Sequence, residues 1–170
     1  APAWGLVRTD GTSRPVTDAA RRFWDTLRPH AALLRRAIPQ PSAIGVWRSR
    51  KNEIFHFCSQ GTVHPHNAAI DAVIDALHWD NLPCRLVSDG MLAAGELGGL
   101  RLLVMPNPYY FTKPQADALD RWVKAGGVLL CDAHLAGYDG TTGRHGRVLP
   151  GCGLAEAWGI REIESTSSHH

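Results

Sequence analysis

The sequence predicts an α/β domain built on a parallel, doubly wound sheet. Short apolar runs, each of the length of a buried strand, recur along the chain. Segments with an apolar period of 3.6 residues lie between these runs. Strands that alternate with helices form parallel sheets joined by crossover connections, and a run that is apolar at every position is buried on both faces of its sheet.

Four strands are expected in this domain, with a flavodoxin-like strand order. The clearest of them is the continuous apolar run that ends at Met105. The expected strands cover residues 43–48, 83–87, 100–105 and 128–131.

Helices are expected between these strands. Asn67 is a candidate N-cap for a helix with an apolar stripe, and Thr112 with Gln115 has the spacing of a capping box for another helix. The pair at 126–127 is Gly-Gly, which ends that second helix. A last helical turn is expected at 153–158, after a glycine-rich loop.

The first forty residues predict a separate helical segment. A short apolar piece at residues 4–8 precedes Thr17, a candidate N-cap, and a second helical stretch follows Pro29 and runs through Ile38. The Pro-Gln-Pro sequence at 39–41 predicts a boundary, because proline removes a backbone donor and restricts the preceding residue. So short a segment cannot bury a core of its own, so we expect it to need a larger body on which to pack.

Composition and charge indicate a globular protein without a membrane or nucleic-acid role. The chain is 44% hydrophobic and 20% charged, and its longest apolar runs are too short to span a bilayer. Residues 1–50 hold nine Arg and three Asp (+6), and residues 51–170 hold nine Lys and Arg and thirteen Asp and Glu (−4). The arginines of the first segment lie along its helical stretches, without aromatic residues between them at the spacing of a nucleic-acid-binding site. This pattern favours a solvated face, or a face that docks on an acidic partner.

The four cysteines are isolated, and no metal site or cofactor is expected. No Cys-x-x-Cys pair occurs, which favours free thiols and a cytoplasmic, reducing compartment. Cys131 lacks the flanking glycines of a nucleophile elbow and is expected to lie inside its strand. A hydrolase that uses Cys131 with His134 remains the alternative from the enzyme class.

Three further motifs are interpreted as structural. His64-Pro65-His66 predicts a surface turn, because two imidazoles without a third ligand make a poor metal site. Asn52-Glu53 lies in a charged stretch and predicts a solvated hairpin or loop, since a retaining glycosidase needs a second carboxylate. The loop at 140–146 fits neither phosphate-binding glycine pattern.

An aromatic segment after the third expected strand is the candidate for a ligand or subunit interface. It lies on the side of the sheet where open α/β folds bind ligands. Exposed aromatic clusters of this kind more often mark interfaces than catalysis. The candidate residues are Asn107, Tyr109, Tyr110, Phe111, His134 and Asp139.

These segments together resemble a known family. The first segment resembles the last strand and helix of the catalytic barrel in family 42 β-galactosidases. This likeness rests on Trp4-Gly5-Leu6-Val7-Arg8-Thr9-Asp10-Gly11-Thr12, followed by Arg14-Pro15. The rest is similar to their middle, trimerisation domain, which has a glutamine-amidotransferase-like fold. The segments that carry this likeness are residues 67–83, 102–106, 122–130 and 134–140.

The resemblance implies three parts. Residues 1–40 would be the end of a (β/α)8 barrel, residues 43–160 the amidotransferase-like domain, and residues 161–170 a polar tail of the kind added during cloning. The parent enzyme would hydrolyse galactoside-type sugars through two barrel glutamates that lie before residue 1, so no catalytic residue is carried over to this chain.

The expected partners are therefore the parent's catalytic barrel and neighbouring subunits of a homotrimer, with no nucleic acid and no membrane. The expected function is a non-catalytic role in assembly and in walling the active site. A sugar-binding module is a further alternative.

Overall fold

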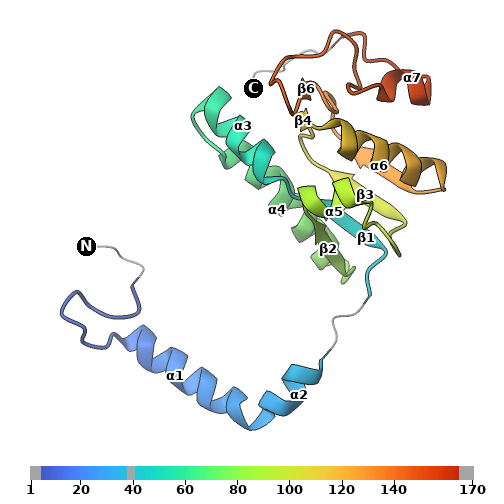
Figure 1. Ribbon diagram of the computed structural model, residues 1–170. Coiled ribbons are helices and arrows are strands. Elements are labelled where there is room, and N and C mark those ends of the chain that lie inside the picture. Colours follow the sequence, from blue (N-terminus) through green and yellow to red (C-terminus); the bar gives the residue numbers. More distant parts are fainter. Residues whose placement is uncertain (1–4, 38–40, 165–170) are drawn as a thin grey trace. The chain divides into compact units, whose positions relative to one another are not determined.

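The computed structural model describes residues 5–37 and 41–164 of the chain (Figure 1). By its internal contacts the chain divides into two compact units, Ala1–Gln40 and Pro41–His170. Sequence predictions that fall on Trp4, on Ile38 and on the tail from residue 165 lie outside the described residues.

The first unit is helical. It contains α1 (Pro15–Leu27), the 3₁₀ turn η1 (Arg28–His30) and α2 (Ala31–Arg36). The prediction that Thr17 caps α1 is wrong, because the helix begins at Pro15 with Arg14 at the N-cap. Proline suits the first helical position, since its φ is already helical and its missing N–H has no partner there.

The first unit buries none of its helical side chains. Phe23 and Trp24 of α1 are both more than half exposed, although they meet edge to face. The strand expected at residues 4–8 is absent from the described part, where Val7 forms only an isolated antiparallel bridge with Ser13. Such a piece gains its stability by packing on another surface.

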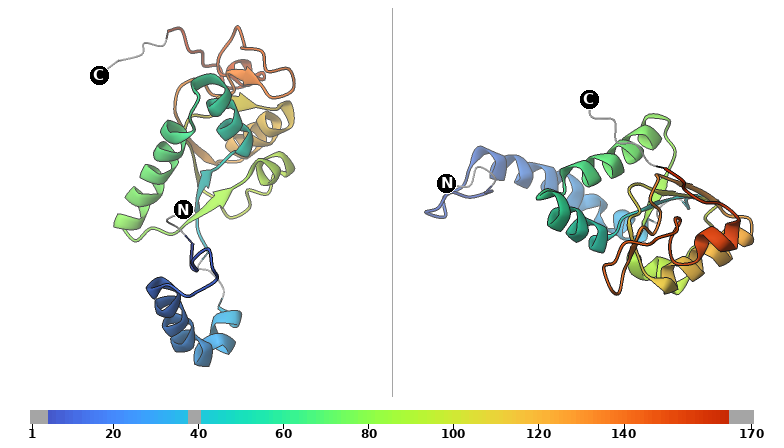
Figure 2. Two further views of the ribbon diagram at one scale, coloured as in Figure 1. Left: turned by 90° about the vertical axis from the view of Figure 1, so that its left-hand side faces the viewer. Right: turned by 90° about the horizontal axis from the view of Figure 1, so that it is seen from above.

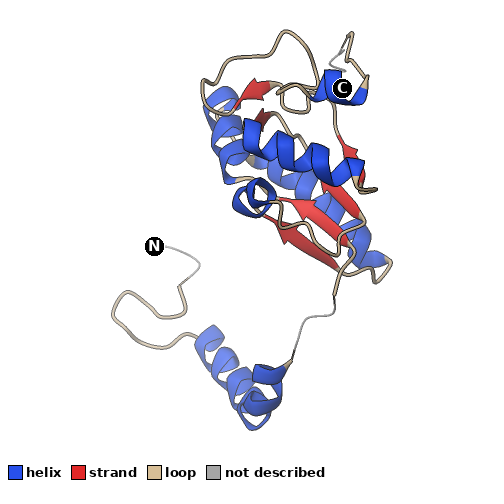
Figure 3. Cartoon of the chain, turned by 45° about the vertical axis from the view of Figure 1, so that its right-hand side comes forward, coloured by secondary structure: helices blue, strands red, loops and turns tan. Residues whose placement is uncertain are grey.

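The second unit is a flavodoxin-like α/β domain, as the sequence predicts. Its parallel sheet has the order β2-β1-β3-β5, with Ile44 of β1 aligned with Cys84 of β2 and Leu102 of β3 (Figure 3). Leu102 is aligned in turn with Val128 of β5. The four predicted strands are confirmed as β1 (Ile44–Trp47), β2 (Cys84–Val87), β3 (Leu102–Met105) and β5 (Val128–Cys131).

Helices lie on both faces of this sheet (Figures 2 and 3). α5 (Asp89–Ala94) and α6 (Lys113–Lys124) contact each other on one face. α3 (Arg50–Gln60) contacts α4 (His64–Trp79), which packs on β1 on the other face. The main core lies under α5 and α6 and includes Trp47, Val87, Leu92, Leu103, Met105 and Leu119.

The helix starts show which local signals were reliable. The capping box of α6 is confirmed. Thr112 is the N-cap residue of this helix, and the Thr112 N–H donates to Gln115 Oε1 at 2.8 Å. The prediction that Asn67 caps α4 is wrong, because the helix begins at His64 with Val63 at the N-cap. Pro65 lies in the first turn, where its missing N–H costs nothing, so the helix extends back past Asn67.

A small second layer lies beyond the carboxyl ends of the main strands. β4 (Tyr110–Phe111) pairs in parallel with β6 (Tyr138–Asp139), and α7 (Leu154–Trp158) contacts α6 (Figure 1). The loop between β5 and α7 therefore returns to the segment after β3. This layer brings together the candidate site residues.

The entry to β5 depends on a glycine without space for a side chain. A Cβ at Gly127 would lie 2.4 Å from the indole ring of Trp122 in α6. We predict that Gly127→Ala lowers the free energy of unfolding by about 1–3 kcal/mol through this overpacking. Unfolding in guanidinium chloride measures this change in the free energy of unfolding. Gly98→Ala is the matched control, since nothing lies within 4 Å of a Cβ there, and equal losses in the two variants would contradict the prediction.

Candidate functional site

The candidate site lies at the carboxyl ends of β1 and β3. The connection after β1 leads to β2 on one side, whereas the connection after β3 leads to β5 on the other. This is the topological switch point, where open α/β sheets commonly hold ligands.

Asn52 fills this switch point with its own side chain. It lies in the first turn of α3, one turn after the N-cap Ser49, and it is completely buried. Its Oδ1 accepts the N–H groups of Tyr109 and Tyr110 at 3.1 and 3.0 Å, and its Nδ2 donates to the Tyr110 carbonyl at 3.0 Å. The loops after β1 and β3 are therefore tied together where a ligand would enter.

A second polar network extends this closure. Ser49 Oγ donates to Asp89 Oδ2 at 2.9 Å, and Gln115 Nε2 donates to Asp89 Oδ1 at 2.9 Å. Ser49 and Gln115 are buried, so these hydrogen bonds replace lost contacts with water. The starts of α3, α5 and α6 are thereby held to one another through a single carboxylate.

The prediction of a solvated hairpin at Asn52-Glu53 is wrong. The segment forms α3, and Glu53 is largely buried between Arg48 Nε and Arg50 Nη1, each 3.1 Å from a carboxylate oxygen. The charges of Arg48 to Lys51 had indicated a loop, but they flank a helix whose inner side is polar. Both oxygens of Glu53 are engaged by arginines, which is a structural role.

The prediction of a surface turn at His64-Pro65-His66 is also wrong. His66 lies in the first turn of α4, is fully buried, and stacks on His56 of α3 with the ring centroids 4.7 Å apart. Within the described residues no ring nitrogen of either imidazole has a hydrogen-bond partner of good geometry. Burial lowers the pKa of His56 and lowers that of His66 to about 4, so both rings are neutral at pH 7.

The stack continues into a chain of rings beside the β4–β6 layer. Tyr109 lies 5.2 Å from His56 and 5.8 Å from His134 between ring centroids. Tyr138 lies 4.5 Å from Phe55 in the same cluster. Sequence reasoning missed Phe55, His56 and Tyr138; the spacing from the cap at Ser49 was the signal that could have placed the first two on one helix.

The structure gathers the predicted interface residues but does not expose all of them. Phe111 is fully buried against Trp47, with 5.3 Å between ring centroids, so the expectation of an exposed aromatic there is wrong. Tyr109 is half-buried, and burial, with Asp132 and Glu162 nearby, raises its pKa.

The two remaining predicted residues hold turns. Asn107 has a positive φ of 46°, and its Oδ1 accepts the Tyr109 hydroxyl at 3.2 Å. Asp139 Oδ1 accepts from the N–H and the hydroxyl of Thr142, and these bonds lower the pKa of Asp139. An interface role for these residues stays a prediction.

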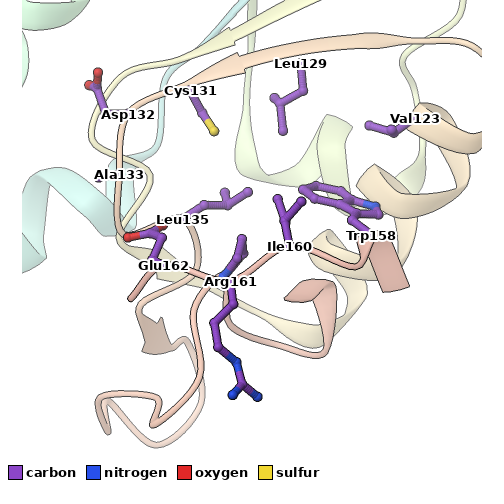
Figure 4. A pocket seen from close by; sticks show the side chains of 11 residues that line it. Val123, Leu129, Cys131, Asp132, Ala133, Leu135, Trp158, Ile160, Arg161 and Glu162 are labelled. Atoms are coloured by element: carbon purple, nitrogen blue, oxygen red, sulfur yellow. The ribbon is translucent and has the colours of Figure 1, made fainter. Parts of the chain in front are cut away.

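A separate hollow of about 530 Å³ lies at the carboxyl end of β5 (Figure 4). In Figure 4, Leu129 and Cys131 of β5 face the indole of Trp158 and Leu135 across it, whereas the Arg161 guanidinium points away. We call it the Trp158 hollow; its apolar wall consists of Val123, Leu129, Cys131, Leu135, Trp158 and Ile160. Its size falls in the range of small-ligand pockets.

Cys131 is unsuited to nucleophilic catalysis in this environment. Burial, with the carboxylates of Asp132 and Glu162, raises the pKa of its thiol to about 11. With this raised pKa the Cys131 thiol is almost wholly protonated at pH 7, whereas the thiolate is the reactive form.

Across residues 5–37 and 41–164, no three His, Cys, Asp or Glu side chains are grouped so as to hold a metal ion. No helix in those ranges is long and apolar enough to cross a membrane.

The buried histidine pair predicts acid sensitivity. The folded pKa of His66 (about 4) lies below its unfolded value of 6.5, so the unfolded chain binds more protons between these values. Stability is therefore full above pH 6.5 and falls as the pH drops toward 4, by up to about 3 kcal/mol. Urea unfolding at several pH values measures this slope.

His66→Phe keeps the ring but removes the proton site, and we expect it to flatten the slope. His78→Phe is the matched control, because His78 is exposed on the same helix. An unchanged slope in His66→Phe would show that other groups cause the acid sensitivity.

The thiols predict a clear order of alkylation. Cys58 is exposed on α3, whereas the pKa of Cys131 is raised from 9.0 to about 11. Iodoacetamide at pH 8 is expected to modify Cys131 about 100-fold more slowly than an unshifted thiol. Mass spectrometry of the native protein, with Cys58→Ser and Cys131→Ser for assignment, measures both rates. Rapid labelling of Cys131 in the folded protein would instead favour a catalytic thiol.

Comparison with solved structures shows what this fold is similar to. No protein-family model matches the sequence, and no curated protein matches it significantly. The fold is similar to the crystal structure of a β-galactosidase from Bifidobacterium adolescentis, with a TM-score of 0.59 and 16% sequence identity. The match covers 72% of this chain and 55% of that chain, so this chain spans about half of the solved one. At this identity the likeness establishes a shared α/β fold.

Proposed function

We propose that this chain is a non-catalytic accessory domain of a glycoside hydrolase of the β-galactosidase type. In this proposal the α/β unit helps assembly and walls the active site of a catalytic barrel. The first forty residues are the trailing end of that barrel. The catalytic glutamates and the galactoside substrate belong to the barrel.

The observation that carries the non-catalytic role is the side chain of Asn52. It occupies the switch point, where the fold would otherwise offer a ligand crevice, and all three of its hydrogen bonds go to the backbone of Tyr109 and Tyr110. The rival assignment as an amidotransferase-like hydrolase needs a reactive Cys131, and the raised pKa of this thiol opposes it.

Two further observations support the link to a glycosidase. Over 72% of its length this chain is similar in fold to a β-galactosidase of known structure. The first unit exposes Phe23 and Trp24 on α1, as a helix does when it packs on a larger body. The ring cluster around Tyr109 and Tyr110 is the surface we assign to the wall of the neighbouring active site.

The proposal predicts that this chain alone does not hydrolyse galactosides. Release of nitrophenol from nitrophenyl β-galactoside is expected to equal the buffer rate, because a retaining glycosidase needs a pair of available carboxylates and both oxygens of Glu53 contact arginines. A β-galactosidase of known activity serves as the positive control. Turnover by the chain that disappears in Glu53→Gln would contradict the proposal.

A further inference from the structure

The layer formed by α3 and α4 has a largely polar interior. The buried side chains of α3 are Asn52, Glu53 and His56. Those of α4 are His66 and Ile70. Among the described residues, no side chain of either helix belongs to the main core under α5 and α6. Apolar burial therefore holds this layer less firmly than it holds the core, and segments with few buried apolar contacts open most readily.

The stacked rings of His56 and His66 join the two helices. Their centroids lie 4.7 Å apart and their planes differ by 20°. All four ring nitrogens are buried without a hydrogen-bond partner among the described residues. The N–H bonds and lone pairs of stacked rings lie in nearly parallel planes, so the two imidazoles cannot share one proton in an N–H···N bond. The pair therefore suits the layer only while both rings are neutral.

The surroundings of the pair do not balance a positive charge. Glu53 is the carboxylate that acts on His66, but both its oxygens already contact arginines. Arg48, one of these arginines, itself disfavours a second positive charge on His66. The side chains of Tyr109 and Gln60, which act on His56, are neutral at pH 7. A proton on either ring would thus create a buried charge without an available partner of opposite sign.

We propose that the His56–His66 pair is an acid-sensitive switch: protonation of either ring separates α4 from the second half of α3, while the sheet and the core under α5 and α6 stay folded. The bonds of Asn52 still hold the first turn of α3, so the change falls on residues 56–60 and on α4. Because His56 also meets the ring of Tyr109 at 5.2 Å, the separation loosens the ring cluster as well.

The switch would confine the first acid-induced change to one layer of the domain. It does not depend on the proposed link to a glycosidase, since it follows from the buried pair alone. Its consequence for that proposal is that acid would alter the ring cluster, the surface assigned to the wall of the active site.

Native-state hydrogen exchange of the full chain between pH 7 and pH 4.5, read by mass spectrometry, tests the switch. Protection factors at residues 56–60 and 64–79 are expected to fall about 20-fold from pH 7 to pH 5, because burial lowers the pKa of His66 from 6.5 to about 4. The open form binds the proton more tightly, so its population rises as the pH falls. Protection at residues 102–105 of β3 is expected to stay constant.

Ring-preserving variants assign the change to the pair. His66→Phe is expected to remove most of the fall in protection, and the double variant His56→Phe, His66→Phe to remove all of it. His64→Phe is the matched control, because His64 is exposed in the same turn of α4, and it is expected to behave as the wild type does. Circular dichroism at pH 7 verifies folding, and the comparison of α4 with β3 in the wild type needs no variant.

An equal loss of protection in α4 and β3 would overturn the switch, because it would show unfolding of the whole domain. Constant protection of α4 down to pH 4.5 would overturn it too, as would a fall that persists undiminished in the folded double variant. These results leave the proposed lack of galactosidase activity to its own test. Conversely, galactoside hydrolysis by the chain would overturn the proposed function without affecting an opening that depends on His66.

Discussion

The three hydrogen bonds of Asn52 are the constraint on which the upper part of the domain depends. They join the start of α3 to the backbone of β4, in the interior, where a lost bond would leave polar groups without water. α3 in turn places the ring of His56 against that of His66, and the ring of Phe55 against that of Tyr138. The position of the ring cluster thus follows from one amide, which also occupies the place where related folds hold ligands.

The main sheet was predictable from the sequence because burial imposes a simple pattern on it. The run Leu102 to Met105 is apolar throughout, since it lies between two strands and beneath helices on both faces. The start of α6 was equally clear, because Thr112 and Gln115 satisfy each other locally. Both signals depend on neighbours in the sequence or on burial alone.

The site was harder to predict because its interior is polar. The inner side of α3 presents Asn52, Glu53 and His56, so the helix lacks the apolar stripe by which buried helices are recognised. The partners that permit this burial, such as the Tyr110 backbone and the ring of His66, come from distant segments. The opposite error arises at Phe23 and Trp24. Their apolar pattern predicts buried side chains, but both side chains are exposed in their own unit.

The central place of β1 has a consequence for the order in which the domain folds. Within its own sheet β1 is synthesised before the other strands, yet both of its neighbours, β2 and β3, lie far downstream. Parallel pairing of this kind requires long loops to close before any contact is gained, which slows folding. During synthesis α4, which contacts β1, emerges before β2 and β3, so it can pack on β1 while the apolar strand Ile44–Trp47 still lacks its sheet neighbours.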